Sequence, residues 1–285
     1  MEKVCFTSFV YGWYQDFIPL FVYSTLLSYP QHFVRVFLYE KLSDGNKRSL
    51  NLIRNQISNS FEVKDCFTEL DDFNLPHKAA YRFVMGRQYF PEFEYIYISD
   101  IDFIVLNEHN NNFYDPYVEH CNQTGLPFSN YWNYDWGKYR VTGLHFIIKT
   151  PYFNVMDKWI NIMKGQNSFR TQCRHNELNP SYDEEMLYYM LVHEFDLRPL
   201  IYYGRKYPGI HLADFREEPV VQKLQLNKKN FMNAAKDSTP LIYERFEKSL
   251  RKSDHIVKTD LFNEIHNNMS EKGKTCIGDY LQYIS

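Results

Sequence analysis

The sequence predicts an α/β protein with a mostly parallel central sheet, flanked by helices, and a helical C-terminal extension. In the first half, short apolar strand candidates alternate with helix candidates, and from about residue 222 the chain becomes polar and helical in character. A repeated strand–helix–strand order needs crossover connections, which place successive strands parallel in one covered sheet. Ligands of such sheets bind at the carboxyl ends of the strands, near the point where the strand order reverses.

The strand candidates of the first half are short runs rich in β-branched and aromatic residues. They are Val4–Val10, Phe33–Tyr39, Phe61–Phe67 and Tyr95–Ser99. The expected helices between them cover residues 16–28, Lys47–Ser58 and His77–Tyr89, with a turn at Asp44-Gly45-Asn46. The first helix stops before Pro30 and the third before Pro91, because a proline disfavours helical backbone in the residue that precedes it.

The second half is less regular. Its expected elements are a short helix at Phe113–Asn122, a loop dense in aromatic residues at Tyr131–Tyr139, a strand at Thr142–Lys149 and helices at Tyr152–Met163 and Asp183–Val192. Acidic residues open the last of these helices, where they complement the helix dipole. We expect an α/β domain over residues 1–220 and the helical extension over residues 221–285.

Composition narrows the classes of function. The net charge is −3 and there is no long basic block, which disfavours a surface that binds nucleic acid. The five cysteines are scattered with no CxxC pair, which argues against a zinc site or a disulfide framework and fits a reducing cytosol. Aromatic residues make up 18% of the chain, a level that fits either a carbohydrate-binding cleft or an AT-rich genome.

The sequence also bears on location. The N-terminus shows no charged and apolar leader, and no run approaches the ~20 apolar residues that a membrane-spanning helix needs. We therefore expect a cytoplasmic protein, with peripheral membrane contact left open.

Asp100 and Asp102 are the first candidates for chemistry. They follow directly after the strand candidate Tyr95–Ser99, and another apolar run comes next. Two carboxylates separated by one residue at a strand end can converge on one divalent cation, and their hard oxygen atoms suit Mg²⁺ or Mn²⁺. Such a cation neutralises the charge that grows as a nucleoside diphosphate leaves. The alternative is a polar β-turn, because Asp-x-Asp is common by chance.

The stretch from Ala80-Tyr81-Arg82 to Ser99-Asp100-Ile101-Asp102 resembles the centre of GT-A-fold glycosyltransferases. It is most similar to the retaining type that contains glycogenin and the bacterial lipopolysaccharide galactosyltransferases, glycosyltransferase family 8. The resemblance implies a Rossmann-like sheet and an arginine, matched here by Arg82, that reaches into the donor site. A buried arginine suits the binding of carboxylate or phosphate. The other interpretation of Arg82 is an ordinary surface charge on a helix.

Three later segments resemble the same families in the expected order. Val141-Thr142-Gly143-Leu144 looks like the strand whose glycine lets the backbone and the donor sugar approach closely. The segment that begins with Asp183 and Glu184 looks like the acidic helix start that holds sugar hydroxyls, so the resemblance makes these two the catalytic candidates. Gly209-Ile210-His211 looks like the segment that supplies His211 as a third metal ligand, which favours Mn²⁺ over Mg²⁺.

The remaining donor-site candidates are Thr7, Tyr11 and Asn130. Thr7 and Tyr11 belong to the end of the first strand, where we expect them to cradle the nucleotide base and ribose. Asn130 is expected to help Gly143 position the donor sugar. The aromatic loop that starts at Asn130 is either an acceptor platform or a packed surface loop.

The chain departs from the family after His211, which is not followed by the glycine and lysine that the family has near the end of the site. That departure leaves open which cation clamps the phosphate. The candidates are Arg205, Lys206 and Arg216.

Together the motifs predict a metal-dependent glycosyltransferase. It would move a sugar from a nucleotide sugar, a UDP-hexose or UDP-N-acetylhexosamine, to a hydroxyl of a glycan or glycolipid with retention, as in polysaccharide biosynthesis. One alternative is a nucleotidyltransferase, but such enzymes usually begin with a glycine-rich, basic phosphate loop, and here the first loop is Tyr11-Gly12-Trp13-Tyr14. The other is a non-catalytic carbohydrate-binding protein, which would leave the ordered acidic residues and His211 unexplained.

Overall fold

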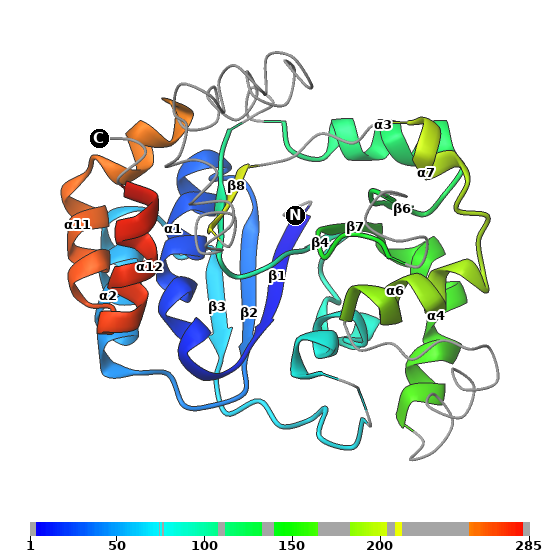
Figure 1. Cartoon of the computed structure of the whole chain (residues 1–285), viewed down its shortest axis with the longest axis horizontal. Helices are drawn as coiled ribbons and strands as arrows, with labels where there is room; N and C mark the ends of the chain where they lie inside the picture. The colour runs from blue at the N-terminus through cyan, green and yellow to red at the C-terminus, as the bar shows by residue number, and fades with distance from the viewer. Residues whose placement is uncertain are drawn as a thin grey trace, which may run out of the picture.

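The computed structural model describes residues 4–73, 75, 77–107, 112–132, 140–164, 183–203, 209–212 and 251–281. Within these ranges the chain forms a six-stranded sheet, a separate two-stranded sheet and flanking helices (Figure 1). Most of the aromatic loop lies outside the described residues, as do the candidate phosphate-binding residues Arg205, Lys206 and Arg216.

The larger sheet has the strand order β3-β2-β1-β4-β7-β6. Its strands are β1 (Val4–Val10), β2 (Phe33–Leu38), β3 (Phe61–Lys64), β4 (Tyr95–Ile98), β6 (Phe128–Ser129) and β7 (His145–Ile148). The first four in the sheet order are parallel, whereas β7 is antiparallel to both of its neighbours. This confirms the predicted α/β class with a mostly parallel sheet. The chain order reverses between β1 and β4, so their carboxyl ends form the edge where ligands of such sheets bind.

The crossover after β1 consists of the 3₁₀ helix η1 (Gly12–Phe17) and helix α1 (Ile18–Ser28), and α2 (Asp44–Gln56) follows β2. The turn expected at Asp44-Gly45-Asn46 is wrong, because these residues form the first turn of α2. Ser43 precedes them in extended conformation, and its hydroxyl accepts a hydrogen bond from the Asn46 N–H at 3.2 Å. This N-terminal cap lets the helix begin earlier than the apolar pattern indicates.

The segment before β4 also differs from the sequence-based expectation. The single helix expected at His77–Tyr89 is replaced by two 3₁₀ helices, η2 (Lys78–Phe83) and η3 (Arg87–Tyr89). Between them Gly86 has extended backbone, with ψ of 170°, and extended backbone cannot continue a helix. The His77 ring caps η2 by accepting the Ala79 N–H at 3.3 Å. The shorter helix matters for function because η2 carries Arg82.

The described helices of the second half are α3 (Asp115–Thr124), α4 (Lys149–Lys164), α6 (Asp183–Val192) and α7 (Pro199–Tyr202). α3 ends at Gly125, whose φ of 69° is the left-handed conformation that glycine adopts without strain. The strand expected at Thr142–Lys149 is shorter than predicted, because Lys149 already begins α4. In Figure 1 these four helices lie to the right of β1, and α1 and α2 lie to its left.

The C-terminal helices α11 (Asp260–Asn267) and α12 (Glu271–Leu281) pack beside α1, α2 and η1 (Figure 1). Tyr23 on α1 places its hydroxyl 2.9 Å from Thr259 Oγ1, and Phe262 belongs to the same buried cluster as Phe6 of β1. The predicted helical character of the C-terminal region is therefore confirmed for residues 251–281. The predicted boundary at residue 220 lies outside the described residues. Among the described residues, no helix has both the length and the apolar content required to cross a membrane.

The two-stranded sheet pairs β5 (Phe103–Val105) with β8 (Gly209–His211) in antiparallel register. Phe103 lies opposite His211, and the Leu212 N–H donates to the carbonyl oxygen of Asp102 at 2.8 Å. This ladder joins the Asp-x-Asp segment to a strand that lies more than a hundred residues later in the sequence. Its register therefore decides where the imidazole of His211 lies.

Gly209→Ala is expected to disrupt that register. A Cβ built on Gly209 would lie 1.9 Å from the carbonyl oxygen of Ile104, a backbone atom that cannot move away without breaking the ladder. If His211 binds a divalent cation, as the sequence predicts, we expect the variant to lose about tenfold or more in cation affinity, because a misplaced second strand moves the His211 ring. Titration with Mn²⁺ in a calorimeter measures the change in affinity. Gly278→Ala is the matched control, since nothing lies within 4 Å of its Cβ position; an equal loss in both variants would contradict the explanation.

Candidate active site

The Asp-x-Asp segment lies at the carboxyl end of β4, beside β1. The Ser99 N–H donates to the carbonyl oxygen of Thr7 at 2.9 Å, which extends the pairing of the two strands by one residue and fixes the point where the chain leaves the sheet. Asp100 and Asp102 follow immediately, and β5 begins at Phe103. Two strands thus hold the segment from both sides, so the backbone that carries the two carboxylates is well positioned.

Asp100, Asp102 and His211 meet as predicted. Each contributes one potential ligand atom, and these three atoms all lie within 4.8 Å of one another. His211 Nε2 lies 3.2 Å from Asp102 Oδ1 and 3.9 Å from Asp100 Oδ2. Two carboxylate oxygens with one imidazole nitrogen are a donor set that suits Mn²⁺ or Mg²⁺. Asp102 is buried, whereas Asp100 and His211 remain partly exposed, so the cluster is open to solvent on one side.

Arg82 is buried at the centre of the site, which rules out the interpretation as a surface charge. Its Nη1 donates to Asp100 Oδ1, and its Nη2 donates to Asp183 Oδ2 at 2.6 Å. Only 6% of the side chain is exposed. Burial lowers the pKa of the guanidinium, but Asp100 and Asp183 outweigh that effect and raise the pKa above its usual range, so the group stays charged. The guanidinium of Arg82 therefore orients a predicted metal ligand, Asp100, and a predicted catalytic carboxylate, Asp183, at once.

Gly143 provides the close approach that the resemblance implied, but to protein atoms. A Cβ at this position would lie 2.6 Å from Arg82 Nη2 and 3.0 Å from Asp100 Oδ2. The Gly143 N–H donates to Glu184 Oε1 at 2.8 Å, and the other oxygen of Glu184 pairs with Arg140 Nε at 2.6 Å. The absence of a side chain at Gly143 thus lets the guanidinium and the start of α6 meet.

Gly143→Ala is expected to push the Arg82 fork away from its two carboxylates, since overpacking costs about 1–3 kcal/mol and is relieved by shifting the nearest side chain. We expect turnover of a nucleotide sugar to fall by about tenfold to a hundredfold, because small displacements of catalytic groups are costly. Steady-state kinetics beside urea unfolding would measure both effects. Wild-type turnover in Gly143→Ala would show that the close packing has no functional role.

The charges of the site do not cancel. Among the described residues, the ion pairs of the site join the carboxylates of Asp100, Asp102, Asp183 and Glu184 to the guanidinium groups of Arg82 and Arg140 and to His211. With every carboxylate ionised and His211 counted as neutral, these described groups carry two negative charges in excess. Burial raises the pKa of Glu184, while Arg140 opposes the shift. Even when Glu184 is protonated, one negative charge remains, and such an imbalance favours a bound divalent cation.

Tyr11 borders the same site. Its hydroxyl lies 3.2 Å from Nε2 of His77, and its pKa is raised by burial, by Tyr14 and by Asp183, while Arg82 acts in the opposite direction. The influence of Asp183 and Arg82 places the ring within electrostatic reach of the central ion pairs. Next to it, the Gly12 N–H donates to Glu40 Oε2 at 2.9 Å. The Glu40 carboxylate thus occupies the N–H group that a phosphate-binding loop would offer to a phosphate. This argues against the nucleotidyltransferase alternative.

Thr7 and Asn130 were expected to contact the nucleotide and the donor sugar, but both side chains are buried. Thr7 lies in the middle of β1, not at its end, and is fully buried, with 0% of its surface exposed. Asn130 is also buried, and both ends of its amide are engaged: Nδ2 donates to the carbonyl oxygen of Thr142 at 3.0 Å, and Oδ1 accepts from the Thr142 N–H at 3.0 Å. The Asn130 amide thus holds the backbone of Thr142, next to Gly143.

Several residues of the site escaped sequence reasoning. Arg140, His77 and Glu40 contact the predicted residues Glu184, Tyr11 and the loop at Gly12, respectively. Each pair lies at least 28 residues apart in the chain, so no short motif joins them. For two of the three, the sequence signal was position: Glu40 follows β2 and His77 precedes η2.

No protein-family model and no curated protein matches this chain. It is similar to the galactosyltransferase LgtC in complex with donor and acceptor sugar analogues, with 11% identity and a TM-score of 0.39 over 65% of this chain and 69% of LgtC. An active-site mutant of LgtC gives 12% identity and a TM-score of 0.38 over 65% of this chain and 68% of that one.

A third similar structure is the bifunctional glycosyltransferase WbbM in its apo form, with 13% identity and a TM-score of 0.36 over 57% of this chain and 34% of WbbM. All three structures are glycosyltransferases, the class that the sequence resemblance predicted.

Proposed function

We propose that this protein is a metal-dependent glycosyltransferase that uses a nucleotide sugar, most simply a UDP-hexose or UDP-N-acetylhexosamine. The observation that supports this best is the convergence of Asp100, Asp102 and His211 at the carboxyl edge of the sheet, next to an excess of negative charge. A site of that composition takes up a divalent cation and, through it, a diphosphate. The acceptor in this proposal is a hydroxyl group of a glycan or glycolipid.

The residues present fit a divalent cation. Asp100 Oδ2, Asp102 Oδ1 and His211 Nε2 would hold Mn²⁺ or Mg²⁺, while Arg82 keeps Asp100 oriented through its other oxygen. When bound, the cation supplies Lewis-acid stabilisation of the charge that develops on the departing diphosphate. Imidazole as a ligand favours Mn²⁺ over Mg²⁺.

The start of α6 would act on the donor sugar. Arg82 orients the Asp183 carboxylate, and the Gly143 N–H with Arg140 orients Glu184. Glycosyl transfer passes through an oxocarbenium-like state, and carboxylates close to the anomeric carbon stabilise its positive charge. Retention, as the family resemblance implies, requires no strong base. If the reaction inverts, Glu184 is the better general base, because burial raises the pKa of its carboxyl toward the working pH.

The proposal is tested by measuring binding of UDP with and without Mn²⁺ by calorimetry, followed by metal-dependent hydrolysis of a panel of UDP-sugars. We expect UDP to bind at least about tenfold more tightly with Mn²⁺ than with EDTA, and one UDP-sugar to be hydrolysed in preference to the others. UDP binding that ignores both Mn²⁺ and EDTA would refute the donor-site assignment. Metal-dependent binding without hydrolysis of any UDP-sugar would favour a binding protein over an enzyme.

A further inference from the structure

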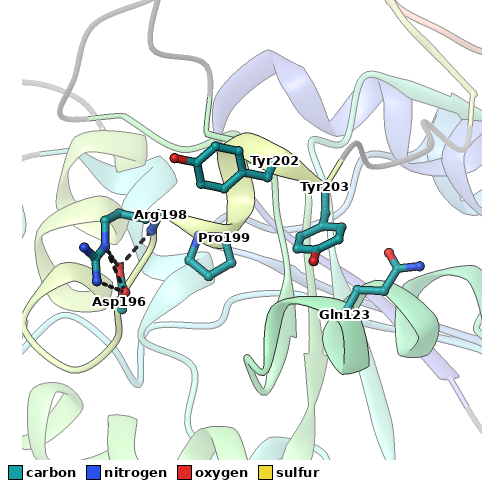
Figure 2. A pocket seen from close by; sticks show the side chains of 6 residues that line it. All are labelled: Gln123, Asp196, Arg198, Pro199, Tyr202 and Tyr203. Carbon is teal, nitrogen blue, oxygen red and sulfur yellow. Dashed lines mark hydrogen bonds and ion pairs between the residues drawn. The ribbon is translucent and has the colours of Figure 1, made fainter.

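A second concave site lies outside the proposed donor site, where α7 meets α3. It is a cavity of about 370 Å³ lined by two tyrosines, a proline and three polar side chains: Gln123, Asp196, Arg198, Pro199, Tyr202 and Tyr203. None of these residues belongs to the ion-pair network around Arg82. Figure 2 shows Asp196 and Arg198 at one end, Gln123 at the other, and the rings of Tyr202 and Tyr203 between them.

The two tyrosine rings are exposed to an unusual degree. Tyr202 is 77% exposed and Tyr203 is 42% exposed, in a chain whose large aromatic side chains are otherwise mostly buried within the described residues. Two neighbouring exposed rings give this surface an apolar area on which a ligand can pack. Phenol rings in particular present an apolar face and a polar edge, which lets them pack against a ligand and hydrogen-bond to it.

The backbone beneath the rings is anchored. Leu197 and Leu200, which alternate with the exposed residues, are buried in a hydrophobic cluster that also contains Phe128 of β6. The carbonyl oxygen of Tyr203 lies 2.9 Å from Nε2 of the buried His120 on α3, and the Tyr203 N–H donates to the carbonyl oxygen of Pro199 at 3.2 Å. The rings thus project from a fixed platform, which lowers the entropic cost of binding a ligand.

The charged residues of the cavity neutralise each other. Arg198 and Asp196 are joined by a salt bridge of 2.6 Å, and the Arg198 Nε also donates to Asp196 Oδ1 at 2.8 Å. The cavity therefore carries no net charge among its lining residues, which disfavours a phosphate or an acidic ligand. The Asp196 carboxylate, the Arg198 guanidinium and the Gln123 amide still offer hydrogen-bond donors and acceptors to the hydroxyl groups of a ligand.

We propose that this cavity is a saccharide-binding subsite for a neutral oligosaccharide. The C–H face of a pyranose packs on an aromatic ring, and its hydroxyls bind planar polar side chains, which is the combination that the cavity presents. In the glycosyltransferase proposed above, a subsite of this kind would hold a remote part of the acceptor chain. That last role rests on the proposed function, whereas the binding of saccharide rests on the cavity alone.

The test uses the full-length protein in EDTA without nucleotide, so that the donor site is not engaged. Binding to an array of neutral and acidic oligosaccharides is measured first, and the Kd of the best neutral oligosaccharide is then measured by saturation-transfer NMR. We expect Tyr202→Ala and Tyr203→Ala each to weaken binding by about tenfold, as the loss of one ring contact implies. Ile201→Ala is the matched control, because Ile201 is 47% exposed on the same helix but does not line the cavity.

The outcomes separate this proposal from the proposed function. Loss of oligosaccharide binding in the tyrosine variants, with hydrolysis of the nucleotide sugar unchanged, supports the subsite. The same loss in a protein that hydrolyses no nucleotide sugar also supports it, and only the proposed function then fails. Binding of acidic glycans alone, binding of no glycan, or an equal loss in Ile201→Ala overturns it. So does a dimer in sedimentation experiments that the double tyrosine variant converts to monomer, because the rings would then form a protein interface.

Discussion

Asp102→Asn is expected to abolish metal-dependent turnover of a nucleotide sugar, with a loss of at least about a hundredfold. The amide keeps the size of the carboxylate but removes one negative charge and one hard anionic ligand from the cluster with Asp100 and His211. Turnover with saturating Mn²⁺, together with the Mn²⁺ affinity from calorimetry, measures the effect. Both quantities are expected to fall, because in the proposed function Asp102 helps to hold the cation that stabilises the leaving group.

A matched control is available on the surface. Asp157 pairs with Arg87 at 2.8 Å, and both side chains are more than a third exposed. Neither residue belongs to the cluster of Asp100, Asp102 and His211. Asp157→Asn removes the same charge from the chain, and we expect it to leave turnover and Mn²⁺ affinity unchanged, since exposed ion pairs contribute about 0–1 kcal/mol. Near wild-type turnover in Asp102→Asn, or an equal loss in Asp157→Asn, would refute the metal-site assignment.

Arg82→Met is expected to destabilise the fold by about 3 kcal/mol in EDTA, because it leaves Asp100 and Asp183 without their shared cation. Both carboxylates are partly exposed, so the loss should lie at the lower end of the range for broken buried pairs. Turnover is expected to be lost as well, since Arg82 orients carboxylates of both halves of the site. Urea unfolding measures stability, and steady-state kinetics measures turnover.

Added metal sharpens the same experiment. Removal of the guanidinium increases the excess negative charge, so Mn²⁺ should restore part of the stability of Arg82→Met. The urea midpoint of this variant should therefore rise more on addition of Mn²⁺ than the urea midpoint of the wild type. Arg87→Met is the control: its guanidinium pairs with Asp157 on the surface, and we expect a change of less than about 1 kcal/mol and no additional effect of metal. A metal response that is the same in both variants would contradict the charge argument.

The elements with strong patterns were predictable. β1, β2 and β4 are buried apolar runs, and their short length with β-branched and aromatic residues distinguishes them from helices. The start of α6 was predictable because acidic residues complement a helix dipole. The segment from His77 to Tyr89 was not, since its two 3₁₀ helices depend on the His77 cap and on the extended backbone at Gly86. The cap of α2 by Ser43 was likewise hidden by the turn-like sequence that follows it.

The sequence by itself determined the α/β class, because strand–helix alternation is a local signal. It also placed Asp100 and Asp102 directly after a strand, whereas His211 became a candidate only through the family resemblance. Tertiary structure alone decided how these parts act together. Arg82 reaches Asp183 across 101 positions, and Gly143 must lack a side chain because that guanidinium occupies the space. Burial likewise became clear only from the tertiary structure. Thr7 and Asn130 are polar residues that the sequence analysis placed beside a ligand, but both side chains are buried. Whether a residue is exposed depends on the packing of elements that lie far from it in the sequence.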